Sequence, residues 1–239
     1  MAAAIVAVVT PASQVQAGPI GDTGSFQYTR VSGYYPTTGG SPMTQGGEFT
    51  LYNVVGLSNA DYSAGTSGLI DNGSFQTFCL EVGEYAASSH FVVGTAAARG
   101  GTTNSVDPIS MGTAYLYSEF AKGTLAGFFN GSRAVEAGLL QMAIWALEGE
   151  VAAPVGNAYY NLALANGGAT TAAQGHLGVY VLNNFTTAAG RDKWATGTWV
   201  ESAKAQDFLY YQVPDGGTTL MLLGGALAGL GALRRRLPL

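Results

Sequence analysis

Charged side chains are scarce in this chain of 239 residues, where Asp, Glu, Lys and Arg make up only 10% of the sequence. About 25% is typical of soluble globular proteins. Residues 18–212 carry 14 acidic and 7 basic side chains, which gives a net charge of −7 with histidine neutral. An acidic surface repels a phosphate backbone, so we expect no nucleic-acid partner.

Metal-ligating and nucleophilic residues are equally few. The chain has two histidines, His90 and His176, and Cys79 is its one cysteine. The sequence contains no glycine-rich phosphate loop and no histidine cluster at metal-ligand spacing, so we expect neither a cofactor nor a metal ion. A single cysteine also cannot form a disulfide within the chain.

The carboxylates do not predict a hydrolytic enzyme. Glu148 and Glu150 are two positions apart on a predicted helix, so they face different directions. Glu81 and Glu84 lie close in sequence to the cysteine, but His90 is the only histidine that could pair with the thiol. We therefore expect no turnover enzyme, and a hydrogen bond from His90 to the cysteine would reopen that question.

Glycine and tyrosine are abundant instead, with 35 and 13 residues, which suits short strands joined by polar loops. Runs of aromatic and β-branched residues separated by Gly, Ser, Pro and Asn predict the strands. In chain order these are Ser25–Ser32, Glu48–Val55, Ser74–Glu81, Phe91–Val93, Val179–Leu182, Trp199–Ser202 and Phe208–Val213.

The middle of the chain changes to helical periodicity. We predict helices over Met111–Leu125, from Ser132 as the cap to Glu150, and over Asn157–Leu164. Helices placed between two groups of strands predict an α+β fold, an antiparallel β-sandwich or barrel with an inserted helical lobe.

The N-terminus has the features of an export signal. Met1–Ala17 begins with an apolar stretch and ends in the small-residue site Val15-Gln16-Ala17. This pattern predicts a secretory signal peptide that is cleaved before Gly18. We therefore expect residues 18–212 to form one extracytoplasmic domain, a size that supports a proper core.

The C-terminal residues from 213 to 239 have three parts. Val213, Pro214 and Asp215 lead into a Gly-Gly turn that ends the folded body. Thr218–Leu233 follows as an uncharged run of Leu, Ala and Gly, slightly short for a membrane span of about 20 residues.

A basic cluster closes the chain after this run. Arg234, Arg235 and Arg236 have the position of a stop-transfer signal that stays on the cytoplasmic side. An ordinary tail anchor is an alternative interpretation. A buried C-terminal helix ranks last, because it would not need three consecutive arginines.

This order of proline turn, hydrophobic helix and arginine cluster resembles the PEP-CTERM sorting signal of exported bacterial proteins. The resemblance covers only about the last 27 residues, with Val-Pro-Asp in place of the usual Val-Pro-Glu-Pro. It implies that an exosortase removes the tail. The precursor would be anchored in the inner membrane and the body delivered to the cell surface or outside the cell.

Two residues of the predicted body are unusual for their surroundings. Strand alternation places Cys79 on the face opposite Phe78 and Leu80, toward a second layer. Gln141 is the one polar residue within Ala137–Leu147, and a helix that is apolar all round is buried. The simplest interpretation is a packed thiol and an amide that hydrogen-bonds loop backbone.

Phe-Cys79-Leu-Glu on a strand and Leu-Gln141-Met-Ala143-Ile144-Trp145 on a helix resemble the thioester domains of bacterial surface adhesins. This chain has Leu where the family usually has Thr before the glutamine. In that family the cysteine attacks the glutamine side-chain amide, expels ammonia and forms an internal thioester. The resemblance implies that Cys79 supplies the sulfur and Gln141 the acyl group.

A thioester must be shielded from water until its target binds, and Trp145, Phe75 or Tyr85 could form an aromatic shield. The resemblance implies adhesion to an amine-bearing surface target. The alternative is a structural matrix protein associated with exopolysaccharide and without a thioester. Contact between the predicted strand Ser74–Glu81 and the helix ending at Glu150 is the condition that the thioester requires.

Overall fold

A computed structural model provides the structure of the chain. It describes residues 20–30, 46–57, 74–87, 89–98, 106–198 and 201–212. The predicted signal peptide 1–17 and the predicted tail 213–239 lie outside these residues.

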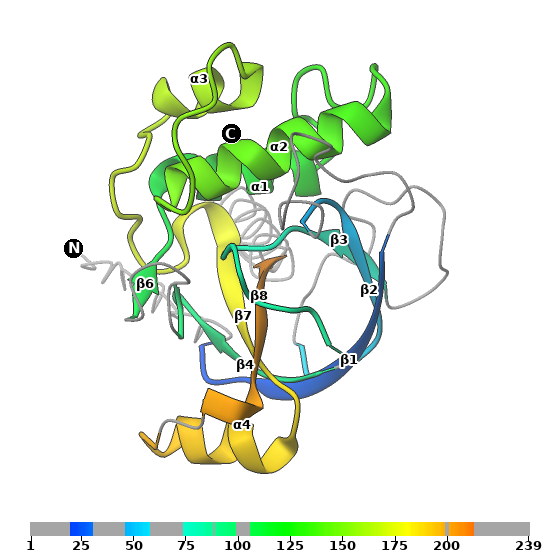
Figure 1. Cartoon of the computed structure of the whole chain (residues 1–239), viewed down its shortest axis with the longest axis vertical. Helices are drawn as coiled ribbons and strands as arrows, with labels where there is room; N and C mark the ends of the chain where they lie inside the picture. Colours follow the sequence, from blue (N-terminus) through cyan, green and yellow to red (C-terminus); the bar gives the residue numbers. More distant parts are fainter. Residues whose placement is uncertain are drawn as a thin grey trace, which may run out of the picture.

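One antiparallel sheet of six strands dominates the described residues, in the order β3-β2-β1-β4-β7-β8. It curls into a half-barrel, as Figure 1 shows. Its two edge strands approach each other where Cys79, just after β3, forms an antiparallel bridge with Phe208 of β8. The strands are β1 (Thr23–Arg30), β2 (Phe49–Val55), β3 (Phe75–Thr77), β4 (Ser89–Gly94), β7 (Val179–Phe185) and β8 (Lys204–Tyr211), with β5 (Ala96–Ala97) and β6 (Asp107–Pro108) forming a separate small sheet.

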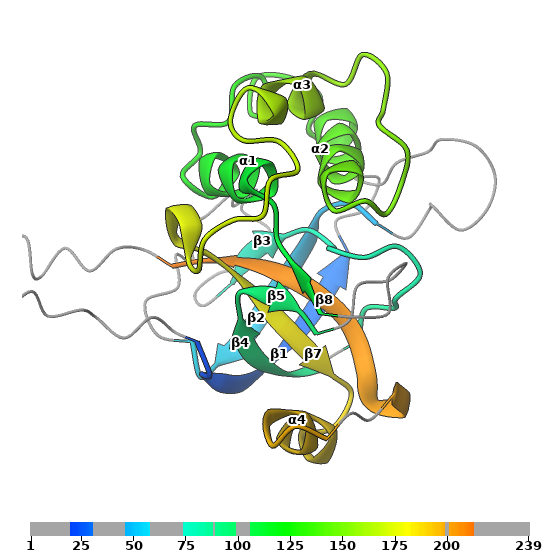
Figure 2. The ribbon, with the colours of Figure 1, turned by 90° about the vertical axis from the view of Figure 1, so that its left-hand side faces the viewer.

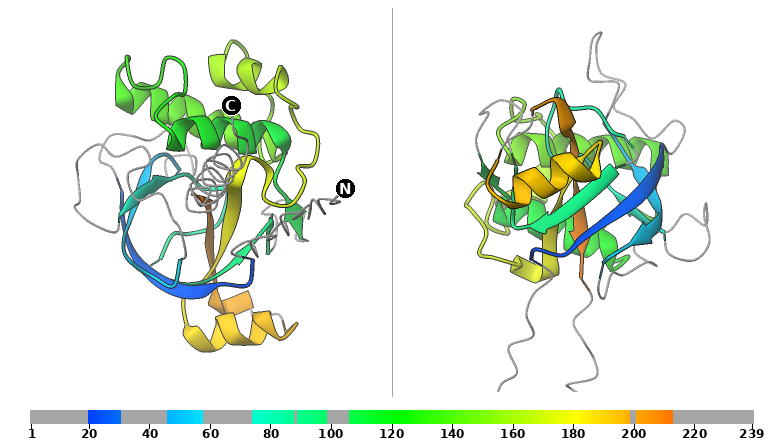
Figure 3. Two further views of the ribbon diagram at one scale, coloured as in Figure 1. Left: turned by 180° about the vertical axis from the view of Figure 1, so that it is seen from behind. Right: turned by 90° about the horizontal axis from the view of Figure 1, so that it is seen from below.

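The helices lie at two ends of the curled sheet (Figure 2). Three pack against one another in a layer at one end, and the fourth contacts β4 and β7 from the other side (Figure 3). The chain enters this three-helix layer after β6 and returns to the sheet at β7. The helices are α1 (Met111–Ala121), α2 (Arg133–Leu147), α3 (Ala158–Leu164) and α4 (Ala188–Ala195), with short 3₁₀ turns η2 (His176–Gly178) and η3 (Glu201–Ala203).

Two apolar clusters fill the interior of the described part of the chain. The first joins α1–α3 to the sheet and contains Phe78, Leu80 and Phe120. The second lies on the other face of the sheet and contains Cys79, Phe208 and many other aromatic side chains. Alternation along 78–80 therefore sends neighbouring side chains into different clusters, as the sequence pattern predicts.

The α+β fold class and the inserted helical lobe agree with the sequence-based expectation. The strands form one curled sheet rather than a two-sheet sandwich, so the barrel-like alternative is the better description. The predicted strand Ser74–Glu81 is wrong in length. After Thr77 the chain leaves β2 and runs along β8, where Leu80 N–H donates to the Asp207 carbonyl at 3.2 Å.

The helix predictions differ from the structure mainly at their ends. The first helix stops at Ala121, because Gly123 has a φ of +75° and turns the chain. Ser132 is the N-cap residue of α2, although among the described residues its side chain makes no capping hydrogen bond. Asn157 caps α3 by accepting from Tyr160 N–H.

Near the end of the body, the structure differs from the prediction in two places. Residues 199–200 lie outside the described residues, and η3 takes the place of the rest of the predicted strand Trp199–Ser202. The helix α4 was not predicted, because its sequence AAGRDKWA has no continuous apolar face.

Candidate functional site

The side chain of Gln141 lies on α2, is fully buried, and faces the backbone around Cys79 across 62 residues of sequence. Its Nε2 donates to the Cys79 carbonyl oxygen at 2.8 Å. Its Oε1 accepts from two backbone N–H groups, that of Cys79 at 3.0 Å and that of Gly47 at 3.1 Å. Three hydrogen bonds therefore join this amide to backbone groups, and two donors converge on its carbonyl oxygen.

Cys79 is 3% exposed and packs in the aromatic cluster on the inner face of the sheet. Its bridge to Phe208 fixes its backbone against β8. Burial raises the pKa of the thiol well above its ordinary value, and the nearby carboxyl groups of Glu81 and Glu84 raise it further despite Arg30. Cys79 is therefore a neutral thiol at neutral pH.

Gly46 and Gly47 cover the Gln141 side chain just before β2 begins. A Cβ atom at Gly46 would lie 2.2 Å from Cη2 of Trp145 and 3.0 Å from Cγ of Gln141, so the backbone rests directly on both side chains. Gly47 has a φ of +114°, a conformation that favours glycine, and its N–H points at Gln141. The two glycines thus bring backbone closer than any other residue could.

The remaining residues of the predicted thioester motif have distinct positions. Ala143 and Ile144 are fully buried in the apolar cluster that joins α1–α3 to the sheet. Trp145 lies in the same aromatic cluster as Cys79, as does Phe75. Tyr85 is 68% exposed, so it is not part of an aromatic shield and that candidate was wrong.

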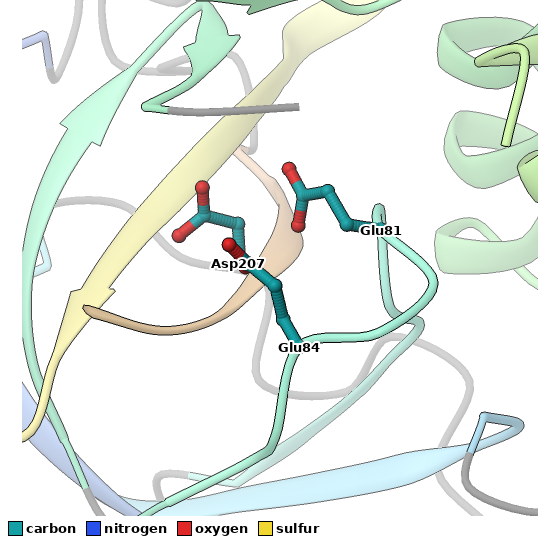
Figure 4. A group of neighbouring side chains, drawn as sticks. All are labelled: Glu81, Glu84 and Asp207. Carbon is teal, nitrogen blue, oxygen red and sulfur yellow. The ribbon is translucent and has the colours of Figure 1, made fainter. Parts of the chain in front are cut away.

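A second polar cluster lies beside this site and was not predicted. Carboxylate oxygens of Glu81, Glu84 and Asp207 lie within 4.8 Å of one another, and Figure 4 shows these side chains turned toward a common centre. The buried ammonium group of Lys204 reaches two of them, at 2.6 Å from Asp207 and 3.0 Å from Glu84. The cluster thus already contains a cation supplied by the protein.

Most oxygen atoms of this cluster have protein partners. Asp207 accepts from the backbone N–H groups of Asn184 and Ala98, and Glu81 accepts from the Gln206 side chain. Burial, followed by the charge of Asp207, raises the pKa of Glu84 to about 7 and raises the pKa of Glu81 well above its ordinary value.

Burial alone would lower the pKa of Lys204, but the surrounding carboxylates raise it. The cluster therefore combines one ammonium group with carboxyl groups whose pKa values burial raises. The sequence signal that could have indicated this cluster is the presence of two charged residues, Lys204 and Asp207, at the start of an apolar strand.

The residues that could have formed a catalytic site lie apart in the structure. His90 lies in β4, paired with Ser25 and Phe185, and no hydrogen bond to the buried thiol occurs among the described residues. Glu148 accepts from Ser110 and Thr113, whereas Glu150 accepts from Val82 N–H. The two carboxylates have different partners, as their spacing predicts.

In a comparison with protein families, residues 212–237 match the VPDSG-CTERM motif. The C-terminal segment is a sorting signal of the PEP-CTERM type. Val213, Pro214, Asp215 and the three arginines fall within it. Such a signal implies an exported protein, anchored in the membrane before release, that a sorting enzyme such as an exosortase processes.

No curated protein and no solved structure matches the chain. The sorting signal therefore concerns the tail, and the function of the body depends on the geometry of its own residues. Within the described ranges, no helix combines the length and apolar character that a membrane crossing requires. The predicted helix Thr218–Leu233 lies outside those ranges.

Proposed function

We propose that the body of this exported, sorted protein forms an internal thioester between Cys79 Sγ and Gln141 Cδ and uses it to attach covalently to an amine-bearing surface target. One observation carries the proposal, namely the convergence of two backbone N–H groups on Gln141 Oε1 beside the chain's one cysteine. Attack on the amide carbon places negative charge on this oxygen. Donors already aimed at it stabilise that charge without reorganisation.

The reaction is balanced without a further reactant. The sulfur of Cys79 bonds to Cδ of Gln141, the Cδ–Nε2 bond breaks, and the thiol proton passes to the nitrogen, which leaves as ammonia. When a target amine attacks, a new C–N bond forms and the C–S bond breaks. The proton released by the amine then restores the thiol.

Burial supports the lifetime of the bond. Cys79 is 3% exposed and Gln141 is 0% exposed, and Trp145 and Gly46 cover the amide. The raised pKa keeps Cys79 a neutral thiol before attack, so its proton must leave as the C–S bond forms. Exclusion of water limits hydrolysis of the product.

In this proposal the protein is not an enzyme, because Cys79 and Gln141 react once per chain and no turnover follows. The target is a primary amine, such as a lysine side chain or an amino sugar on a cell surface or in an extracellular matrix. Attachment to such a target requires that Trp145 or the glycine segment Gly46–Gly47 move aside.

A structural matrix protein associated with exopolysaccharide is the alternative. The hydrogen bonds of Gln141 to the Cys79 peptide group, one donated and one accepted, are also those with which an amide joins a helix to a strand. In that case Cys79 remains a packed thiol, and the amide nitrogen of Gln141 is retained.

Intact-mass measurement of the exported protein distinguishes the two functions. Thioester formation predicts a mass lower than the sequence mass by one ammonia, no free thiol, and an adduct with methylamine that releases the thiol. Cys79→Ala should retain the ammonia and form no adduct. Gln76→Ala, which alters another buried glutamine, is the matched control and should still lose ammonia. A wild-type protein with full mass and a free thiol would exclude the thioester.

A further inference from the structure

The segment Gly46–Glu48 follows α2 in reverse order, and its contacts with the helix span the whole site. Gly46 rests on Trp145, Gly47 donates to Gln141, and Glu48 pairs with Arg133 in the first turn of α2. Three consecutive residues thus meet the helix along most of its length.

The Glu48–Arg133 ion pair is closely fitted and mostly buried. Arg133 Nη2 donates to one carboxylate oxygen at 2.6 Å and Nε donates to the other at 3.0 Å. The side chain of Glu48 is 0% exposed and that of Arg133 is 17% exposed. The guanidinium also lies over the rings of Phe120, Phe128 and Phe129, at 5.2 to 5.9 Å from their centroids. A bidentate pair in an aromatic setting fixes both direction and distance.

The two N–H donors on Gln141 Oε1 are held in different ways. Cys79 N–H belongs to the edge of the sheet, where the bridge to Phe208 sets its position. Gly47 N–H precedes β2 and adjoins Glu48, whose carboxylate is tied to the helix that carries Gln141. The ion pair therefore connects the second donor to the same helix as its acceptor.

We propose that Glu48 and Arg133 are positioning residues, which hold the Gly47 N–H on Gln141 Oε1 and so accelerate thioester formation. This inference rests on the proposed function. An oxyanion donor is effective only when its direction and distance are fixed before reaction. If the ion pair is loosened, the glycine segment can move away from α2 while the sheet still holds Cys79.

The test follows ammonia loss by intact mass during refolding of the full chain, with circular dichroism recorded on the same sample. We expect Glu48→Gln and Arg133→Lys to reach the native dichroism signal and then lose ammonia at least tenfold more slowly than the wild type. Arg133→Lys retains the charge but not the bidentate geometry, so a slow rate in this variant identifies geometry as the cause. Arg191→Lys, in the surface pair with Asp192 on α4, is the matched control and should react at the wild-type rate.

A purely structural ion pair predicts a different result. The variants would then have lower melting temperatures but, once folded well below those temperatures, would lose ammonia at the wild-type rate, which would overturn the inference alone. A wild-type chain that never loses ammonia overturns the proposed function and this inference together. If Glu48→Gln does not fold, the milder Arg133→Lys variant and Glu48→Asp provide the same comparison.

Discussion

At Gln141, one amide makes three hydrogen bonds to backbone groups that belong to two distant parts of the chain. A buried amide without partners costs about 1–3 kcal/mol, so these bonds matter for folding whether or not the amide reacts. For this reason Cys79→Ala, which leaves all three bonds in place, is a better chemical test than removal of the glutamine.

A second residue, Glu148, should make folding stability depend on pH. It lies at the C-terminal end of α2, where burial raises its pKa to about 7, although hydrogen bonds from Thr113 and Ser110 oppose the shift. Its ordinary value is 4.5, so the folded state binds more protons between these two pH values. Stability contributed by protonated Glu148 is present below pH 4.5 and is lost as the pH rises to about 7.

We therefore expect Glu148→Gln, which keeps an oxygen acceptor for both donors, to gain stability relative to the wild type by about 3 kcal/mol between pH 4.5 and pH 8. Urea unfolding at the two pH values measures this difference. Asp192→Asn, at a carboxylate whose side chain is 64% exposed, serves as the control. An equal effect of Glu148→Gln at both pH values would contradict the raised pKa.

The burial of some of these residues could be predicted from the sequence, whereas the ion-pair partners of others could not. Gln141 could be predicted as buried because every neighbour on its helix is apolar, and Cys79 because strand alternation gave its direction. Glu48 and Arg133 are 85 residues apart, and their pairing leaves no local pattern. Lys204 likewise pairs with the carboxylate of Glu84, which is 120 residues away in the sequence.

At the scale of elements, the glycine segment before β2 is fitted to the surface of α2. We expect Gly46→Ala to destabilise the protein by about 1–3 kcal/mol, because the new methyl group would overlap the six-membered ring of Trp145. Displacement of that ring should also expose the site and raise the rate of hydrolysis of a thioester. Chemical denaturation measures the first effect, and recovery of free thiol over time measures the second.

A second-site variant provides the control for Gly46→Ala. Trp145→Phe removes the ring atoms Cη2 and Cζ2, which lie 2.2 and 2.4 Å from the added methyl group. The double variant should therefore lose less stability than the sum of the two single variants, with a coupling of about 1 kcal/mol or more. Strict additivity would mean that the clash is relieved elsewhere.

The elements themselves were predicted unevenly. α1, α2 and α3 have apolar periodicity and end signals in sequence, so their existence was correct and only their ends shifted. The strand at Cys79 was predicted to be too long, because the chain changes its pairing partner there from β2 to β8. A change of strand partner depends on tertiary contacts and has no signature in alternation.

At the scale of the whole molecule, the sorting signal predicts a defined route. Deletion of Arg234–Arg236 should remove the stop-transfer cluster, and replacement of Val213–Asp215 should remove the recognition turn within residues 212–237. We expect both variants to be retained in the membrane or mislocalised. Cell fractionation and the mass of the mature C-terminus measure the outcome, and wild-type values for both variants would contradict the prediction.

The bridge between Cys79 and Phe208 has a consequence for timing. β8 ends at Tyr211, immediately before the sorting signal begins at residue 212, so the sheet edge that holds Cys79 is among the last parts of the body to be synthesised and exported. A chain stalled before this strand emerges has the cysteine and the glutamine but not the edge that aligns them. Under the proposed function, thioester formation is therefore expected only after the body is complete, so that the group does not react with an amine inside the cell.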